Sequence, residues 1–193
     1  MDLILASTSK YRKALVERLG VPFRSEDPAV DESAWKSEMI GKAPLALAEA
    51  LALAKASAVA ARFPESVVIG GDQVVAFDDQ ILGKPGTDER AVAQLHEMSG
   101  RSHELITAMV VIAPGRTFRE TNVATLRLRP LSLRSIKRYV EADHPSDCAG
   151  SYKLEARGIA LFDRIEADDH SAITGIPLIA LTSILIELGF EIP

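Results

Sequence analysis

The chain has 193 residues, of which 47% are hydrophobic and 25% are charged, a composition typical of a soluble globular protein with a sizeable core. Its formal net charge of −5 argues against a surface that binds nucleic acid or an anionic membrane, because either would need a basic face. The sequence contains no apolar run of about 18 residues and no signal-peptide pattern, so we expect a cytoplasmic protein that does not enter a membrane.

The N-terminal residues have the pattern of a buried strand that leads directly into a helix. Residues 2–6, which are apolar from Leu3 onward, predict the strand. Residues 10–19 predict the helix, which is expected to end at Gly20, where a left-handed cap forms easily.

Hydroxyl and cationic side chains gather between this strand and this helix. Ser7 or Ser9 can cap the helix through its hydroxyl, and Arg12 and Lys13 lie on the first turn. A helix start with such side chains is a good place for a phosphate, so this turn is a candidate anion site. The alternative is an ordinary strand, turn and helix whose cations are solvated.

Residues 21–35 predict an irregular segment that carries an acidic pair, Asp31 and Glu32. The pair is either a solvated turn or the source of a carboxylate for a site. Residues 43–62 then predict a helix rich in Ala and Leu, because its apolar residues recur at spacings of three and four. Lys55 lies in the second half of this helix.

The middle of the chain predicts a short buried strand, a hairpin and a helix. Residues 66–70 form the fully apolar strand, which is expected to end in Gly71-Asp72-Gln73. Residues 74–77 and 80–82 predict the hairpin. The helix is expected to begin after Thr87, which can cap it, and to continue to residue 99.

The remaining sequence predicts two long strands over 103–113 and 117–128, joined by a short Pro-Gly-Arg turn and therefore antiparallel. The further expected elements are a helix over 132–141, a polar loop over 144–158, a strand over 159–165, and a helix opened by Pro177 and closed by Gly189. Strands and helices alternate without linkers. The expected fold class is therefore α/β with a mixed sheet.

Two carboxylates are candidates for a catalytic or metal-binding role. Asp72 follows a predicted strand, and α/β sheets usually present catalytic residues where strands end. Glu32 supplies a second carboxylate from a loop. Two carboxylates beside a phosphate site suit Mg²⁺, which binds one or two carboxylates and keeps waters and substrate oxygens. For both residues the alternative is a structural role in a turn.

Lys84 stands in a Gly-Lys-Pro tripeptide, which leaves its ammonium group as a credible clamp on phosphate. The tripeptide does not belong to a P-loop, because Asp78 and Pro85 stand where that motif requires Gly and then Ser or Thr. Lys55 is a weaker indication, since most helical lysines are solvated. The sequence contains no Gly-x-Gly-x-x-Gly, so dinucleotide binding has no support.

Seven short motifs along the chain are weak one by one and specific as an ordered set. They are Ala6-Ser7-Thr8-Ser9-x-x-Arg12-Lys13, Val30-Asp31-Glu32, Lys55-Ala56, Gly71-Asp72-Gln73, Gly83-Lys84-Pro85, Ala149-Gly150-Ser151-Tyr152-Lys153-x-Glu155 and Thr174-Gly175-Ile176-Pro177-Leu178. They occur in the order seen in the Maf family, and they cover nearly the whole length. The chain therefore resembles a Maf-type nucleoside triphosphate pyrophosphatase.

The resemblance implies a single bilobed Maf-like domain over residues 1–193, with an elongated mixed β-sheet, flanking helices and a cleft, as in inosine triphosphate pyrophosphatase-like proteins. It also implies hydrolysis between the α and β phosphates of a nucleoside triphosphate, a divalent metal that we expect to be Mg²⁺, and a homodimer.

The family's functional residues carry over to matching positions of this chain. The implied catalytic residues are Asp72, Glu32, Lys55 and Lys84, the implied substrate-binding residues are Ser7, Ser9, Arg12 and Lys13, and the implied metal ligands are Glu32 and Asp72. Asp72 would be the proton acceptor. That role is hard to combine with tight metal binding, and the sequence does not decide between the two.

Within the family the chain is most similar to the 7-methyl-GTP branch, through Gln73, Glu155 and the segment Cys148-Ala149-Gly150-Ser151-Tyr152-Lys153. The implied reaction gives 7-methyl-GMP and pyrophosphate, and would limit the incorporation of modified nucleotides into nucleic acids. The family's specificity positions match Tyr11, Gln73 and Glu155. A 7-methylated guanine is positively charged, so an aromatic ring and a carboxylate would favour it. The alternative substrates are dTTP and UTP.

Two departures from the family pattern bear on these expectations. Ala54 and Ala50 stand where relatives often have an acid and an arginine, so Lys55 lacks an adjacent carboxylate to anchor it. Ala156 stands where relatives of this branch tend to have glycine. If that position needed a positive φ, alanine would strain the backbone.

A different class of function is a nucleotide-sensing inhibitor of septum formation, since Maf proteins are also associated with division arrest. A sensor needs no second carboxylate and no base. The presence of Glu32, Asp72, Lys84 and Arg12 together therefore favours an enzyme, although the two roles can coexist.

Overall fold

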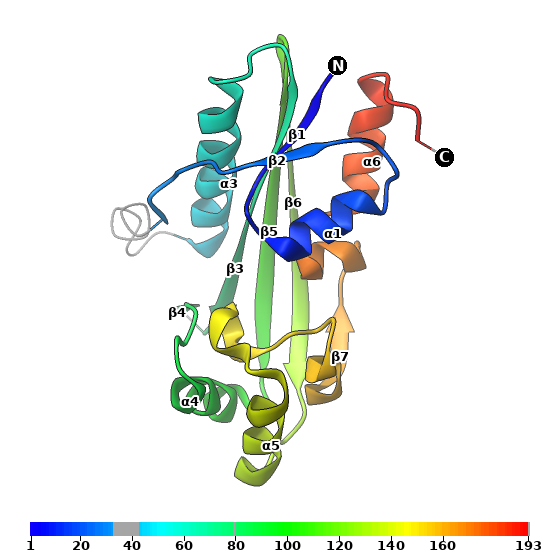
Figure 1. Ribbon diagram of the computed structural model, residues 1–193. Helices are drawn as coiled ribbons and strands as arrows, with labels where there is room; N and C mark the ends of the chain where they lie inside the picture. Colours follow the sequence, from blue (N-terminus) through cyan, green and yellow to red (C-terminus); the bar gives the residue numbers. More distant parts are fainter. Residues whose placement is uncertain (33–42, 79, 193) are drawn as a thin grey trace. The chain divides into compact units, whose positions relative to one another are not determined.

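Figure 1 shows the computed structural model of the protein, which describes residues 1–32, 43–78 and 80–192. These residues form a mixed sheet with the strand order β2-β1-β3-β5-β6-β7, and β4 pairs with β3. The strands are β1 (Leu3–Ala6), β2 (Arg24–Glu26), β3 (Val67–Phe77), β4 (Gln80–Leu82), β5 (Ser102–Ala113), β6 (Arg116–Leu128) and β7 (Phe162–Glu166). Strand β1 is parallel to β2 and β3, whereas β4 is antiparallel to β3 and β7 to β6. The expected α/β class with a mixed sheet is confirmed.

Helices alternate with these strands along the chain. The α-helices are α1 (Lys10–Glu17), α3 (Pro44–Ala60), α4 (Asp88–Met98), α5 (Leu133–Asp143) and α6 (Leu178–Glu187). The 3₁₀ turns of the described residues are η1 (Pro145–Asp147), η2 (Ala149–Ser151), η3 (Arg157–Leu161) and η4 (His170–Thr174). In the part of the chain that is described, no helix is both long and apolar enough to cross a membrane.

The chain divides into two compact units. The first unit contains Met1–Gln73, Thr107–Asn122 and Asp169–Pro193, and the second contains Val74–Ile106 and Val123–Asp168. Strands β3, β5 and β6 contribute residues to both units.

In the first unit, helices cover both faces of the sheet. Leu5 of β1 and Ile69 of β3 pack in one buried cluster with Leu15 of α1 and Leu181 of α6. Alternate strand residues such as Ile4 form a second cluster on the α3 side. Because both faces are covered, β1 and the first residues of β3 are apolar throughout instead of alternating between apolar and polar residues.

In the second unit, α4 and α5 pack against each other, and Leu95 of α4 and Ile136 of α5 are fully buried. Strand β4 forms the expected hairpin with the end of β3. Part of the predicted polar loop over 144–158 is compact instead of open, since it forms η1 and η2 and buries Tyr152.

Three boundaries differ from the sequence predictions. Residues 21–35 were expected to be irregular, but Arg24–Glu26 form β2, whose polar residues show no strand periodicity and pair through the backbone. Residues 33–35 of that prediction lie outside the described residues. Strand β3 does not end before Gly71 but continues to Phe77, and β7 begins only at Phe162 because residues 159–161 belong to η3.

Gly70 brings α3 unusually close to β3. A Cβ atom at this position would lie 2.6 Å from the backbone oxygen of Ala52 and 2.6 Å from the backbone nitrogen of Ala56. Both contacts are with helix backbone, which cannot move aside cheaply. The small residues of the alanine-rich helix and the glycine of the strand therefore set the distance between the two elements.

Gly70→Ala is expected to lower the free energy of unfolding by about 1–3 kcal/mol, because α3 must shift away from the sheet. Urea unfolding monitored by circular dichroism measures the loss. The matched control is Gly83→Ala, where the new Cβ would meet nothing within 4 Å and the change should stay within about 1 kcal/mol. Equal stability of the two variants would contradict the close packing of α3.

A buried histidine lies in an aromatic cluster of the second unit. His103 Nε2 is 2.9 Å from the hydroxyl oxygen of Tyr152, and the rings of Tyr152 and Phe162 meet edge to face. His103 is 3% exposed, and its Nδ1 has no hydrogen-bond partner among the described residues. Burial lowers the pKa of His103 from its usual 6.5 to about 4. The folded protein therefore holds this ring neutral.

Because the folded-state pKa of His103 lies below its unfolded value, its contribution to stability is complete above pH 6.5 and is lost as the pH falls toward 4. Between pH 7 and pH 4 this loss is about 3 kcal/mol. We expect urea unfolding of His103→Gln to lose less stability over that range than the wild type. His96→Gln, which changes an exposed histidine on α4, should follow the wild type. Identical pH profiles for all three proteins would contradict a neutral buried His103.

Candidate active site

The centre of the candidate active site is Lys55, whose ammonium group lies between two carboxylates. Lys55 Nζ is 2.7 Å from Asp72 Oδ1 and 2.6 Å from Glu32 Oε1. Lys55 and Asp72 are only 5% and 6% exposed, whereas the side chain of Glu32 is 46% exposed. The three charges are therefore held at the boundary between the protein interior and solvent.

This arrangement corrects the expectation that Lys55 is poorly anchored. The sequence places Ala54 and Ala50 where an acid and an arginine were expected, but carboxylates remote in sequence hold the lysine instead. The close approach of α3 to β3 at Gly70 makes this possible, because it carries Lys55 to the neighbouring strand residue Asp72.

Asp72 itself lies inside β3 and not after its end. The strand backbone continues on both sides of it, so the residue keeps an extended conformation and a fixed side-chain direction. The predicted location at a strand terminus is wrong, but the side chain still reaches the lysine of α3.

Arg12 adds a second cation to this group. Its Nε donates a hydrogen bond to the backbone oxygen of Gly175 over 3.2 Å. Burial lowers the pKa of Arg12, and the charges of Asp72 and Glu32 oppose this shift. The charges of Arg12 and Lys55 together balance those of the two carboxylates.

Two glycines leave room for the Arg12 side chain. Gly175 has a φ of 126°, and a Cβ there would lie 3.3 Å from Arg12 Cγ and 3.4 Å from its Nε. A Cβ on Gly71 would lie 3.6 Å from the same Nε. The Gly71 and Gly175 motifs of the sequence thus meet at one arginine.

The hydroxyls at the start of α1 are engaged with the local backbone. The Ser9 hydroxyl accepts a hydrogen bond from the Arg12 amide over 3.4 Å and caps the helix, which decides between the two predicted caps. The Ser7 hydroxyl accepts from the Ser9 amide over 3.1 Å. On the same helix Lys13 is exposed, and Lys10 Nζ lies 4.9 Å from the centre of the Tyr11 ring.

Gln73, expected to be a specificity residue, forms its side-chain hydrogen bonds with residues of the first unit. Its Nε2 lies 2.9 Å from Thr107 Oγ1 and 3.0 Å from each of the backbone oxygens of Ala172 and Ile173. The side-chain amide of Gln73 therefore links β3 to both β5 and η4.

Lys84 and Glu155 lie in the second unit and are both exposed. Lys84 follows β4, and Glu155 lies in the turn before η3. The neighbouring Ala156 has a φ of −116°, so the left-handed strain considered for it does not arise. Glycine is required at Gly158 instead, where a Cβ would lie 2.4 Å from the backbone oxygen of Lys153.

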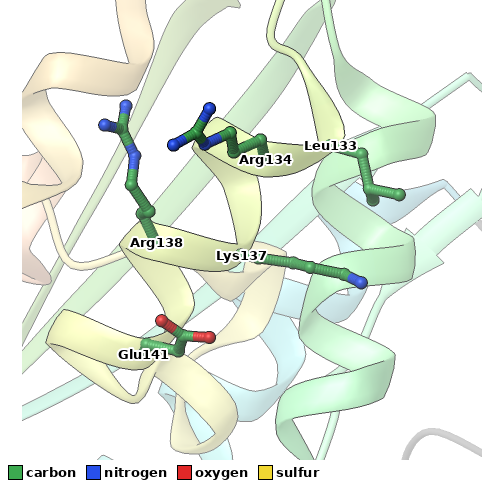
Figure 2. A pocket seen from close by; sticks show the side chains of 5 residues that line it. All are labelled: Leu133, Arg134, Lys137, Arg138 and Glu141. Atoms are coloured by element: carbon green, nitrogen blue, oxygen red, sulfur yellow. The ribbon is translucent and has the colours of Figure 1, made fainter.

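Figure 2 shows the side chains that line a pocket on α5 of the second unit, and none of them belongs to a predicted site residue. Its lining residues are Leu133, Arg134, Lys137, Arg138 and Glu141. All five are exposed side chains of this one helix. The pocket offers basic side chains but no pair of carboxylates.

Sequence reasoning missed Asp169, a carboxylate that is 5% exposed in the first unit. Its Oδ1 accepts hydrogen bonds from the amide and hydroxyl of Ser171, and its Oδ2 accepts from the amide of Ile179. An aspartate two residues before a serine is a known local turn pattern, so the signal was present but weak.

The charged group can perform proton transfer and bind phosphate. Asp72 offers a carboxylate for a proton, and the cations of Lys55 and Arg12 can stabilise negative charge on phosphoryl oxygens. Glu32 and Asp72 are hard oxygen donors of the kind that Mg²⁺ binds. No cluster of three or more His, Cys, Asp or Glu side chains suited to a metal occurs among the residues described.

Known proteins resemble this chain over nearly its full length. The family pattern described as "Maf-like protein" matches residues 2–188. A 7-methyl-GTP pyrophosphatase of Xanthomonas axonopodis pv. citri is 48% identical over 191 residues, which are 99% of this chain and 98% of the relative. Relatives of the same name from Bdellovibrio bacteriovorus and Pseudomonas aeruginosa are 48% and 44% identical, over 95% and 100% of this chain and 95% and 99% of the relatives.

Among solved structures, the Staphylococcus aureus Ham1 protein has a TM-score of 0.52 with this chain at 13% identity, and the match covers 97% of this chain and 100% of the other. At that identity the likeness concerns the fold alone. The range matched by the family pattern, residues 2–188, includes Lys55, Asp72, Arg12 and Gly175, which meet in the structure. On these findings the chain belongs to the Maf-like protein family.

Proposed function

We propose that the protein is a nucleoside triphosphate pyrophosphatase that hydrolyses 7-methyl-GTP to 7-methyl-GMP and pyrophosphate. The observation that carries the proposal is the group of four charges in which Lys55 lies 2.7 Å from Asp72 and 2.6 Å from Glu32, with Arg12 nearby. The substrate follows from the relatives, which are named 7-methyl-GTP pyrophosphatase and are 44% to 48% identical over nearly full length.

In the proposed reaction a water oxygen bonds to the α-phosphorus, and the bond from that phosphorus to the α–β bridging oxygen breaks. Pyrophosphate leaves with the bonding electron pair, and Asp72 takes a proton from the water. Lys55 orients Asp72 through the ion pair between them.

Cationic and hydroxyl side chains are proposed to hold the phosphates. Arg12, Lys13 and Lys84 would bind the phosphoryl oxygens, where positive charge stabilises the transition state. The hydroxyls of Ser7 and Ser9 would donate hydrogen bonds to the triphosphate. A hydroxyl can do this while its oxygen accepts a hydrogen bond from the backbone, as both do here.

A divalent metal, Mg²⁺ in our proposal, would be held by Glu32 and Asp72. The donor set fits, because it offers two carboxylates with a partly exposed side chain at Glu32. Bound there, the ion would neutralise charge on the triphosphate. Lys55 already compensates the two carboxylates, so we expect metal to bind well only together with the anionic nucleotide.

Tyr11 and Glu155 are proposed to favour the methylated base. The ring of Tyr11 already attracts a cation, as the Lys10 ammonium 4.9 Å from its centre shows. The ring of 7-methylguanine carries a positive charge of the same kind. Glu155 would contribute a carboxylate. The single Maf-like domain over 1–193, the homodimer, the cytoplasmic location and any link to septum formation stay predictions.

A panel of nucleoside triphosphates with Mg²⁺ tests the proposal. Pyrophosphate and orthophosphate are measured separately, because cleavage between the α and β phosphates releases only the former. The expected result is pyrophosphate release with the highest kcat/KM for 7-methyl-GTP over GTP, dTTP and UTP. Preference for dTTP or UTP would reassign the substrate, and no turnover of any triphosphate would refute the enzymatic proposal.

A further inference from the structure

The hydrogen bond from Arg12 Nε to the oxygen of Gly175 makes the position of the guanidinium depend on a backbone segment far away in the sequence. A guanidinium held through Nε presents its terminal nitrogens in a fixed direction, and those nitrogens match two oxygens of a phosphoryl group. Whatever fixes the carbonyl of Gly175 therefore also fixes the direction of Arg12.

One end of the segment that carries this carbonyl is fixed by Asp169. Its Oδ1 lies 2.9 Å from the amide nitrogen and 2.5 Å from the hydroxyl oxygen of Ser171, and its Oδ2 lies 2.8 Å from the amide nitrogen of Ile179. The Ser171 hydroxyl in turn accepts from the amide of Leu178 over 2.8 Å. Asp169 thus closes a loop that runs from η4 to the first turn of α6 and contains Gly175.

The middle of the segment is fixed by Gln73 of β3. Its amide nitrogen is 3.0 Å from each of the carbonyl oxygens of Ala172 and Ile173. Thr107 of β5 supports the same place, because its hydroxyl donates to the carbonyl of Ala172 over 2.9 Å. The amide of Gly175 also donates to the carbonyl of Ala172, over 2.9 Å. The strands of the sheet therefore hold the backbone immediately before Gly175.

We propose that the 169–175 segment positions Arg12 for phosphate binding, and that Asp169 and Gln73 are positioning residues that hold this segment. The inference rests on the proposed function, since it gives Arg12 the phosphates as its ligand. Asp169 and Gln73 do not touch the nucleotide in this role. In this role Gln73 acts through the backbone of η4.

A double-mutant cycle between Asp169→Asn and Arg12→Met tests the link, with inorganic tripolyphosphate as the probe. Its binding to the folded proteins is measured by calorimetry in the presence of Mg²⁺. Asp169→Asn alone is expected to raise the Kd about tenfold, as for the loss of one charge-assisted contact. In the Arg12→Met background the same change should have no further effect, because the residue it positions is already missing.

The matched control is Asp168→Asn, which makes the same chemical change at the neighbouring exposed aspartate. It should bind tripolyphosphate as the wild type does. Additive effects of the Asp169 and Arg12 changes would overturn the inference, because a merely structural role of Asp169 is independent of Arg12. If Asp169→Asn does not fold, Ser171→Ala replaces it in the cycle, since it interrupts the same relay to Leu178.

Gln73→Met tests the second positioning residue. It is expected to raise the tripolyphosphate Kd about tenfold and to leave the ratio of kcat/KM for 7-methyl-GTP over UTP unchanged. A changed ratio with unchanged tripolyphosphate binding would assign Gln73 to the base and overturn its positioning role. If the wild type bound no tripolyphosphate, the inference would fail. If it bound the probe but hydrolysed no triphosphate, only the proposed function would fail.

Discussion

Asp72→Asn is expected to lower kcat for 7-methyl-GTP by about three orders of magnitude, because an amide cannot accept the proton of the attacking water. The change keeps the size of the side chain and its place in β3, so the fold should persist. The amide oxygen can still accept a hydrogen bond from Lys55, and Glu32, the other proposed metal ligand, is unchanged, so KM should change less than kcat. Steady-state release of pyrophosphate measures both constants.

Asp78→Asn is the matched control for this prediction. Asp78 is an exposed aspartate just after the same strand, with a φ of 52°, a conformation that asparagine also adopts readily. Its ion pair with Arg101 lies at the surface of the second unit, and kcat should stay close to that of the wild type. Turnover by Asp72→Asn within tenfold of the wild type would show that another group takes the proton.

Lys55→Met is expected to lower the free energy of unfolding by about 3 kcal/mol, the scale found when one partner of a buried ion pair is removed. The loss arises because Asp72, which is 6% exposed, is left without the ammonium group that lies 2.7 Å from it in the wild type. Urea unfolding without added metal measures the difference. Lys137→Met, at an exposed lysine on α5, is the control and should change stability by less than about 0.5 kcal/mol.

Lys55→Met also tests whether Lys55 and the proposed metal compete for the same two carboxylates. Lys55 Nζ occupies the position between Glu32 and Asp72, so its removal should allow a divalent cation to compensate the two carboxylates. We expect Mn²⁺ to bind nucleotide-free Lys55→Met at least tenfold more tightly than the nucleotide-free wild type, and to recover part of the lost stability. Calorimetric titration with Mn²⁺ gives the affinities. Equal affinities would mean that Lys55 and metal do not compete for these carboxylates.

Elements with strong local signals were predictable from the sequence. The N-terminal helix was placed by its serine cap and by Gly20, and the structure shows the Ser9 cap and a positive φ of 68° at Gly20. The alanine-rich helix was placed by its periodicity and spans Pro44–Ala60. In both cases neighbouring residues carry the signal, because helix capping and propensity act over a few residues.

Strand boundaries were less predictable. The polar Arg24–Glu26 strand is held by backbone pairing to β1, and its side chains show no alternation that would predict a strand. The pattern at Gly71-Asp72-Gln73 suggested the end of a strand, but pairing carries β3 on to Phe77. A glycine lowers strand propensity locally, and the neighbouring strands override that preference.

The sequence by itself determined the family, the α/β class and the set of residues proposed for chemistry, because ordered motifs and periodic patterns are local properties of the chain. Only the tertiary structure decided which of these residues act together. It placed Lys55 between Asp72 and Glu32, joined Arg12 to Gly175 across 163 positions of sequence, and revealed Asp169 behind that contact. The physical reason is that ion pairs and hydrogen bonds depend on distance in space, and a close approach such as that of α3 to Gly70 leaves no periodic trace in the sequence.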